Sequence, residues 1–354
     1  MSYAAVLGGA ERILLDQATA LEGPVAVACP PGALADAARA GGLEVVTLSE
    51  QRAELRGSPR DRLAAPLRLA ALRREVRTAV VGMGPRSVIG WSMRGVLVAA
   101  GALAGVRGGP PLVFCHNDLL PSRGVGIAVR AAASRAQRVV ALSHAIAEDL
   151  DPTGRLAVEV IHPGVDLERF TPGPLPDGPP EALVLGAIVG WKRPDLALEA
   201  AKLAVGELPG LRVRLAGAPL GAAGEELWRT LERRVATIGL AHLDGGVEDV
   251  PGALARSTCL LHCADTEPFG VALTEALACG RPVVAPRAGG PLEIVDESCG
   301  ALYEPGDSAA AAAALVHVVR HAPDMAGPAR ERAEQLFDRR TSRRRFRALV
   351  EELT

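Results

Sequence analysis

The chain has 354 residues, 49% of them hydrophobic, which is enough to fill the cores of two ordinary domains. Its formal net charge of −2 excludes the strongly basic composition of many nucleic-acid-binding proteins. No run approaches the ~18 apolar residues of a membrane-spanning helix, and residues 1–17 lack the basic region and cleavage site of a signal peptide. We therefore expect a soluble, cytoplasmic protein that binds no nucleic acid.

In the first half of the chain, short apolar runs alternate with longer segments of helical spacing. The runs predicted to be buried strands are residues 25–29, 44–48, 111–115, 138–142 and 157–161, and the predicted helices are residues 10–21, 62–76 and 94–106. Such a succession predicts an α/β fold, with a parallel sheet and helices on both of its faces.

A strand over residues 2–7 is expected to lead into the glycine pair Gly8–Gly9 and then a helix. This order presents backbone N–H groups to an anion, although the dinucleotide fingerprint G-x-G-x-x-G is absent. A structural turn and a ligand-binding loop are both compatible with it. The strand is short, so either it is complete at this length or part of it lies upstream of Met1.

Residues 166–181 contain five prolines, which predicts a hinge between two domains, residues 1–165 and 182–336. In the second half the predicted strands are residues 182–189, 211–217, 259–265 and 281–286, with helices starting at Pro194, at Gly224 and near Gly270. Residues 337–354 include an amphipathic helix that we expect to cross back to the first domain. Two doubly wound domains leave a central cleft, and ligands bind such sheets at the carboxyl ends of the strands.

The six cysteines lie mostly in apolar runs without C-x-x-C spacing. Alternation along a strand would send Cys259 and Cys263 to one face and His262 to the other, which argues against a metal site. We expect reduced thiols in the core.

Lys192 is one of only two lysines among 39 basic residues, and it stands just before the helix that starts at Pro194. A cation near a helix N-terminus is unfavourable with the helix dipole. A bound anion would offset this cost, and so would full solvation of the side chain.

His116 follows a predicted strand at the edge where ligands bind, so it is either a structural hydrogen-bonding group or a functional one. The sequence around His144, His162 and His262 gives a weaker indication of a functional role.

Two acids, Glu267 and Glu275, are separated by seven residues at the start of a predicted helix. Glu267 falls on the preceding loop, where Phe269 and Gly270 let the backbone approach a ligand. Glu275 falls inside the helix among apolar neighbours, so we expect it to be partly buried and to need hydrogen-bonding partners such as sugar hydroxyls. Residues 287–290, "RAGG", offer further N–H groups at a strand end.

The segment "EPFGVALTEALACGRPVVAPRAGGPLEIV" resembles the signature of family-4 retaining glycosyltransferases, which have the GT-B fold of two Rossmann-like domains. "GGAER", "CHNDL", "VVALSHAIAEDL", "IHPGVDLERF" and "WKRPDLALEA" resemble other landmarks of that family in the same order. The resemblance covers essentially the whole chain.

The resemblance implies a nucleoside-diphosphate sugar as donor, a hydroxyl acceptor and no cofactor or metal. In it, Lys192 and the amides of Phe269 and Gly270 hold the diphosphate, Glu275 binds the ribose and Glu267 contacts the transferred sugar. The resemblance also implies that His116 lies near the sugar and the acceptor hydroxyl. It implies that Gly9 closes over the diphosphate or the acceptor.

One position departs from the family pattern, because Ala187 stands where an arginine usually provides a second cation. Three functions therefore remain in view: transfer of a hexose-type sugar, a catalytically weak or inactive sugar-nucleotide-binding subunit, and a GT-B-like epimerase. Arginines concentrated between Arg52 and Arg77 leave open a peripheral contact with the inner face of the membrane, and a solvated helix face explains them equally well.

Overall fold

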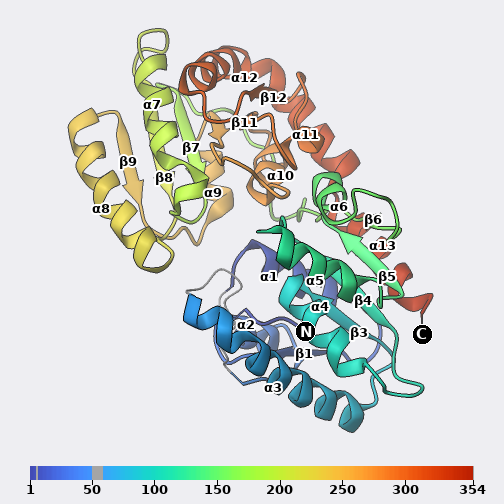
Figure 1. The fold of residues 1–354 in the computed structure, drawn as a ribbon. Helices are drawn as coiled ribbons and strands as arrows, with labels where there is room; N and C mark the ends of the chain where they lie inside the picture. The colour runs from blue at the N-terminus through green and yellow to red at the C-terminus, as the bar shows by residue number, and fades with distance from the viewer. Residues whose placement is uncertain (5–6, 50–58, 354) are drawn as a thin grey trace. The chain divides into compact units, whose positions relative to one another are not determined.

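The computed structural model describes residues 1–4, 7–49 and 59–353, the side chains of residues 59–66 excepted. The chain divides into two compact units, Met1–Pro163 with Arg340–Thr354, and Gly164–Arg339 (Figure 1). The domain boundaries expected from the sequence remain predictions. Part of the arginine-rich stretch from Arg52 to Arg77 lies outside the described residues, and membrane contact also stays a prediction.

The first unit contains only parallel strand pairs among its described residues. β1 (Ala26–Cys29) pairs with β2 (Glu44–Thr47), and a separate sheet has the order β3-β4-β5-β6, with strands Val88–Trp91, Leu112–His116, Arg138–Ala141 and Glu159–Val160. The expected strand over residues 2–7 is not formed in its described part, and residues 5–6 lie outside the description. The predicted strand at 157–161 shortens to two residues.

The start of the chain joins these two sheets. The Ser2 N–H donates to the Ala28 carbonyl (3.0 Å), the Met1 amino group donates to the Ile89 carbonyl (2.8 Å), and the Trp91 N–H donates to the Met1 carbonyl (2.9 Å). Met1 and Ser2 therefore occupy the position of a strand between β1 and β3.

The helices of the first unit are α1 (Gly9–Ala18), α2 (Ala33–Ala40), α3 (Pro59–Met83), α4 (Ser92–Leu103), α5 (Arg123–Ala133) and α6 (His144–Leu150). Serine caps begin two of them: Ser122 accepts from the N–H of Val125 in α5, and Ser143 accepts from the N–H of Ile146 in α6. The core of the unit includes Val96 and Val98 of α4 and Phe114 of β4, all fully buried.

The C-terminal helix α13 (Arg339–Glu351) packs on this first unit, as the sequence predicted. Gln17 donates to the Ser342 hydroxyl (2.9 Å), and Arg343 pairs with Asp16 (2.6 Å). Buried Phe346 adds an apolar contact surface on the same helix.

The second unit is a six-stranded parallel sheet in the order β9-β8-β7-β10-β11-β12. Its strands are β7 (Glu181–Leu185), β8 (Arg212–Ala216), β9 (Ala241–Asp244), β10 (Cys259–Leu261), β11 (Val283–Pro286) and β12 (Gly300–Tyr303). Counted along the unit, this is the doubly wound order 3-2-1-4-5-6, whose topological switch lies between β7 and β10. Ligands of such sheets bind outside the carboxyl ends of the strands at the switch.

The other elements of this unit are η1 (Gly190–Lys192), α7 (Pro194–Ala204), α8 (Gly221–Ile238), α9 (Val250–Ala255), α10 (Val271–Ala278), α11 (Pro291–Ile294) and α12 (Ser308–Leu336). The helix predicted from Gly224 begins three residues earlier. The six cysteines are free and buried, which confirms their prediction as core thiols. No described helix combines the length and the apolar character needed to cross a bilayer.

The proline-rich segment that follows Gly164 is fastened to the second unit. Phe170 is buried in its core, and Arg330 of α12 donates to the Phe170 carbonyl (2.7 Å). The fully buried Arg281 donates to the carbonyls of Gly173 (2.9 Å) and Pro174 (2.7 Å). These contacts hold residues 170–174 in place, and a hinge motion elsewhere in residues 166–181 stays a prediction.

Candidate functional site

The loops after β7 and β10 meet at the switch point of the second sheet. The first forms η1, which ends at Lys192, and the second runs from His262 to Gly270. The Asp265 N–H donates to the Trp191 carbonyl (2.9 Å), which ties the two loops together.

Lys192 and Glu267 form a direct ion pair at this edge. The Lys192 ammonium donates to Glu267 Oε2, and the Glu267 side chain is only 10% exposed. His262 Nε2 lies 3.0 Å from the same oxygen. Burial by itself would raise the pKa of Glu267, but His262 and the charge of Lys192 outweigh it and lower this pKa to about 2. Glu267 is therefore a carboxylate at neutral pH.

His262 belongs to this cluster, although the sequence interpretation ranked it below His116. β10 ends at Leu261, so the predicted strand over 259–265 is too long, and His262 is the first residue beyond the carboxyl end. Its burial lowers the pKa of the imidazole, against the opposing charge of Glu267, so the ring is neutral at neutral pH. Its position directly after a parallel strand, five residues before Glu267, was the available signal.

The glycine pair Gly289–Gly290 gives the Glu267 loop its shape. The Gly290 N–H donates to the Glu267 carbonyl (2.8 Å), and a Cβ on Gly290 would lie 2.1 Å from the Phe269 carbonyl oxygen. Only glycine fits this approach. The pair was expected to offer N–H groups to a ligand; the N–H of Gly290 is instead used within the protein.

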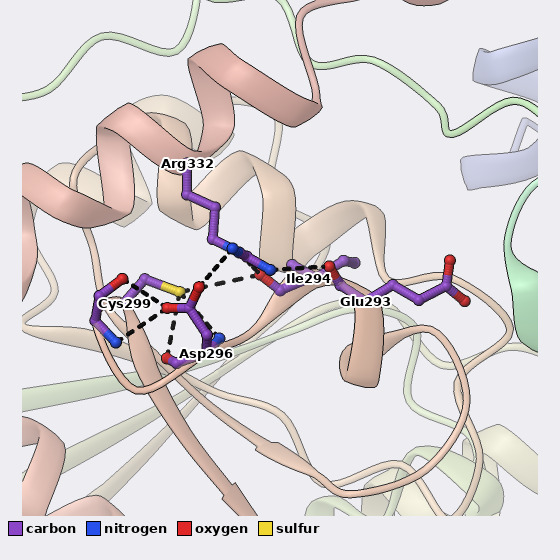
Figure 2. A network of polar contacts seen from close by, with 6 residues as sticks. Glu293, Ile294, Asp296, Cys299 and Arg332 are labelled. Atoms are coloured by element: carbon purple, nitrogen blue, oxygen red, sulfur yellow. Dashed lines mark hydrogen bonds and ion pairs between the residues drawn. The ribbon is translucent and has the colours of Figure 1, made fainter.

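The turn beyond this pair is fixed by a polar network (Figure 2). Arg332 of α12 donates to the carbonyls of Ile294 (2.5 Å) and Glu293 (3.1 Å) and pairs with Asp296. Residues on α12 thus hold α11, and α11 follows directly from the glycines that support the Glu267 loop.

Helix α10 begins at Val271, next to the predicted start. Gly270 is its N-cap, with φ of 115°, a conformation that strains any other residue. The Phe269 ring is buried against Phe337, with ring centroids 6.0 Å apart. A ligand at this position would therefore contact the backbone of Phe269 and not its side chain. Glu275 lies in the second turn of α10 and is half-buried, in agreement with the expectation.

The first amides of α10 lack intrahelical acceptors and stand at the positive end of the helix dipole. This end directly follows the loop that carries Glu267, whose charge Lys192 already balances. The edge can therefore receive an anion next to a cation and a carboxylate that are held in place.

Arg193 is committed to other partners. It adopts the left-handed conformation (φ 50°, ψ 50°) before Pro194, and its guanidinium pairs with Asp195 and Asp265, each at 3.0 Å. Ala187, in the loop after β7, is exposed. Because its guanidinium is already paired with these two carboxylates, Arg193 is not a free second cation.

Two predicted site residues belong to the first unit. His116 is the last residue of β4 and is fully buried, and neither of its ring nitrogens has a hydrogen-bonding partner among the described residues. Burial lowers its pKa to about 3, so the ring is neutral. Gly9 is the first residue of α1, where the preceding Gly8 N–H donates to Glu11 Oε2 (3.1 Å).

Lys192, Glu267, Phe269, Gly270 and Glu275 belong to the second unit, where Lys192 and Glu267 are in direct contact, and His116 and Gly9 belong to the first. The carboxylate of Glu11 caps the start of α1, as in a structural turn. The roles of all seven residues remain predictions.

Comparisons with known proteins agree with this architecture. The family model described as Glycosyl transferases group 1 matches residues 167–335, and the model described as Glycosyltransferase Family 4 matches residues 7–169. A D-inositol 3-phosphate glycosyltransferase of Saccharomonospora viridis is 32% identical over 281 residues, covering 68% of this chain and 65% of the relative. The protein of the same name from Geodermatophilus obscurus is 32% identical and covers 66% of this chain and 59% of the relative. The chain thus spans less than two thirds of the length of these relatives.

Solved structures show the same fold. HepE of Anabaena, in a complex with UDP and glucose, superposes with a TM-score of 0.83 at 22% identity and covers 99% of this chain and 98% of its own. A glycosyltransferase of Rickettsia africae superposes with a TM-score of 0.80 at 16% identity, covering 99% and 97%. With family models over both halves and these neighbours over its length, the chain belongs to the family-4 glycosyltransferases with the GT-B fold.

Proposed function

We propose that the chain is a retaining glycosyltransferase that moves a hexose-type sugar from a nucleoside-diphosphate sugar to an acceptor hydroxyl. The observation that carries the proposal is the cluster of Lys192, Glu267 and His262 at the switch point of the second sheet, beside the start of α10. The glycosyltransferase relatives and the UDP and glucose of the HepE complex support this choice of chemistry.

The donor diphosphate binds Lys192 and the amides around Phe269 and Gly270. In the ligand-free chain the lysine charge is neutralised by Glu267, so the diphosphate exchanges one anionic partner of Lys192 for another. Glu267 keeps its contact with the neutral His262 and accepts a hydrogen bond from the sugar. Glu275 accepts hydrogen bonds from the ribose hydroxyls.

In the transfer step, the bond between the anomeric carbon and the leaving phosphate oxygen breaks while the acceptor oxygen bonds to that carbon on the same face. Breaking that bond leaves negative charge on the diphosphate, which Lys192 and the α10 amides stabilise, and the leaving phosphate oxygen takes up the acceptor proton. Because these groups supply the positive potential at the diphosphate, we propose that the transfer is metal-independent. The neutral ring of His116 can hydrogen-bond a sugar or acceptor hydroxyl, since its nitrogens have no described partner.

Glu275→Ala tests the donor site. A panel of sugar nucleotides in a thermal-shift screen first identifies the donor, because a ligand raises Tm by mass action. Loss of the ribose contacts should then weaken donor affinity ~10–100-fold, the value of a hydrogen bond to a charged group. Glu207→Ala, which removes an exposed partner of Arg320, is the control. Unchanged donor affinity in Glu275→Ala would contradict the assignment.

A second candidate, a weak or inactive donor-binding subunit, is favoured by one observation. Ala187 replaces the usual arginine, and Arg193 is already paired with Asp195 and Asp265. If a second cation is what limits turnover, Ala187→Arg should raise the transfer rate by about one to two decades. Donor binding without transfer to any acceptor in both forms would establish the subunit, and conversion of the donor without acceptor would reveal an epimerase.

A further inference from the structure

Two exposed histidines, His317 and His321, lie about one turn apart on helix α12, which packs against α7 in the second unit (Figure 1). Residues four apart lie on the same face of an α-helix. The two rings contact each other, with centroids 4.5 Å apart and planes inclined by 39°. Two imidazoles thus leave the helix side by side, at the spacing that binds zinc in H-E-x-x-H helices.

The His321 ring is fixed in the tautomer that a metal ligand needs. Its Nδ1–H donates to the backbone carbonyl of His317 (2.8 Å), because a carbonyl oxygen can only accept. In the neutral ring Nε2 then carries the lone pair, and that hydrogen bond does not use it. Metal-bound histidines commonly donate their other ring N–H to a carbonyl in the same way, which orients the ring.

The distance between the two rings suits one shared ion. Zinc–nitrogen bonds of about 2.0–2.1 Å place two ligand nitrogens roughly 3–3.5 Å apart. Rings whose centroids are 4.5 Å apart can bring one nitrogen each to that separation. The His317 ring is exposed, so it can turn either nitrogen toward the ion.

The charges beside the pair favour a cation. Arg320 stands between the two histidines in sequence, but its guanidinium pairs with Glu207 (2.9 Å), so its charge is balanced. Asp324 is exposed and lies three residues beyond His321, on the same side of the helix. Its carboxylate adds a negative potential next to the imidazoles.

We propose that His317 and His321 bind one divalent transition-metal ion of the class that prefers imidazole, Zn²⁺, Ni²⁺ or Cu²⁺, on the surface of α12. Nε2 of His321 and one ring nitrogen of His317 are the protein ligands, and water completes the coordination. The ion joins the turn just before Pro323, which has no N–H to donate to the Val319 carbonyl. It therefore braces α12 where the helix lacks a hydrogen bond.

Another pair of histidine rings, His144 and His162 of the first unit, is less suited to an ion. Their centroids are 6.0 Å apart, with one ring edge-on to the other. His144 starts α6 and His162 follows β6, so no helical spacing fixes the pair. The α12 pair also shares no residue with the cluster around Lys192, and the proposed metal site does not depend on the proposed transfer reaction.

Titration calorimetry of the full chain with zinc chloride alone tests the site. We expect one ion per chain, and His317→Ala or His321→Ala should weaken its binding by at least about tenfold. His242→Ala, at an exposed histidine of β9, is the matched control and should leave the affinity unchanged. Magnesium chloride should not compete, because Mg²⁺ prefers oxygen ligands.

A relocated pair separates chelation from binding by a single histidine. Ala313 is exposed and lies four residues before His317, so Ala313→His in the His321→Ala chain rebuilds a pair at the same spacing. Zinc affinity should largely return in this double variant. An affinity as low as that of His321→Ala would overturn chelation by the helical pair.

Hydrogen exchange shows whether the ion braces the helix. Saturating zinc should slow exchange of the His321 and Ala322 amides at least about tenfold, because chelation requires the helical turn. His317→Ala should abolish this protection, and unchanged exchange in the unaltered chain would overturn the bracing role. No zinc binding at all, unchanged affinity in both alanine variants, or loss of binding in His144→Ala would overturn the site itself.

Discussion

Each unit places a histidine at or just beyond the carboxyl end of a parallel strand, and the two histidines differ in their polar surroundings. In the second unit His262 lies beside Glu267, which pairs with Lys192, and Gly290 donates to the same loop. In the first unit both ring nitrogens of His116 lack a described partner. The second histidine thus lies against a paired charge, and the first has no described polar partner for its ring nitrogens.

The difference indicates two kinds of preparation for substrate. A charged ligand needs charges that are already fixed, because reorganising them costs free energy at the moment of reaction. An uncharged hydroxyl needs only a neutral donor or acceptor, and an unpartnered imidazole can be either. Four experiments test this contrast between the two units.

Glu267→Gln should have the largest effect. The substitution keeps the size of the side chain and removes the charge that holds Lys192, so a donor-dependent transfer rate should fall about 10²–10³-fold, as for other groups arranged around a developing charge. Initial rates at saturating donor measure it, with Glu207→Gln as the surface control. A transfer rate within threefold of the unaltered chain would show that the fixed charge of the second unit does not serve catalysis.

The two glycine pairs should respond differently to alanine. A Cβ on Gly290 would meet the Phe269 backbone at 2.1–2.3 Å, whereas a Cβ on Gly8 would meet only the flexible end of Glu11 at 3.0 Å. Gly290→Ala should lower the free energy of unfolding by about 3 kcal/mol, and Gly8→Ala by about 1 kcal/mol or less. Urea unfolding of the two variants measures the ratio. Equal losses of unfolding free energy in the two variants would mean that the close backbone approach at Gly290 does not distinguish it from Gly8.

The sequence predicted the fold where apolar runs are strong and central. β4, β5, β7, β8 and β11 were found because buried parallel strands are almost continuously apolar. The edge strand β9 was missed because only Ala241 in it is buried. The long helix α12 was missed because Pro323 and Pro328 interrupt its pattern, although the helix continues through both.

The site was predicted as far as its chemistry lies in local motifs. The start of α10 and the partial burial of Glu275 follow from spacing near Gly270. Two contacts join residues from the ends of different strands: the ion pair of Arg193 with Asp265, and the close approach of Gly290 to Phe269. No local sequence pattern predicts such contacts. His262 was ranked below His116 because the end of β10 depends on its neighbouring strands.

The two histidines should shift stability in opposite directions when replaced by leucine, which has a similar volume. His116→Leu removes two buried polar atoms without partners and should raise the free energy of unfolding by about 1–2 kcal/mol. His262→Leu removes a neighbour of the buried Glu267 carboxylate and should lower it by about as much. Thermal unfolding measures both. If His116→Leu slows transfer while it stabilises the fold, His116 serves substrate binding at the expense of stability. A loss of stability in both variants would contradict the proposed difference between the two histidines.

Acid should reveal the smallest effect, through the carboxylate of Glu267. Its folded pKa of about 2 lies below its usual value of 4.5, so the unfolded state takes up protons first as the pH falls. The stabilisation is fully present above pH 4.5 and is lost as the pH drops toward 2. The Tm difference between the unaltered chain and Glu267→Gln should therefore shrink by a few degrees between pH 5 and pH 3. Glu207→Gln, at an exposed pair, supplies the baseline for surface charge. A Glu267→Gln difference that stays constant over this range would mean that His262 and Lys192 do not stabilise the carboxylate, and the contrast between the two histidines would fail.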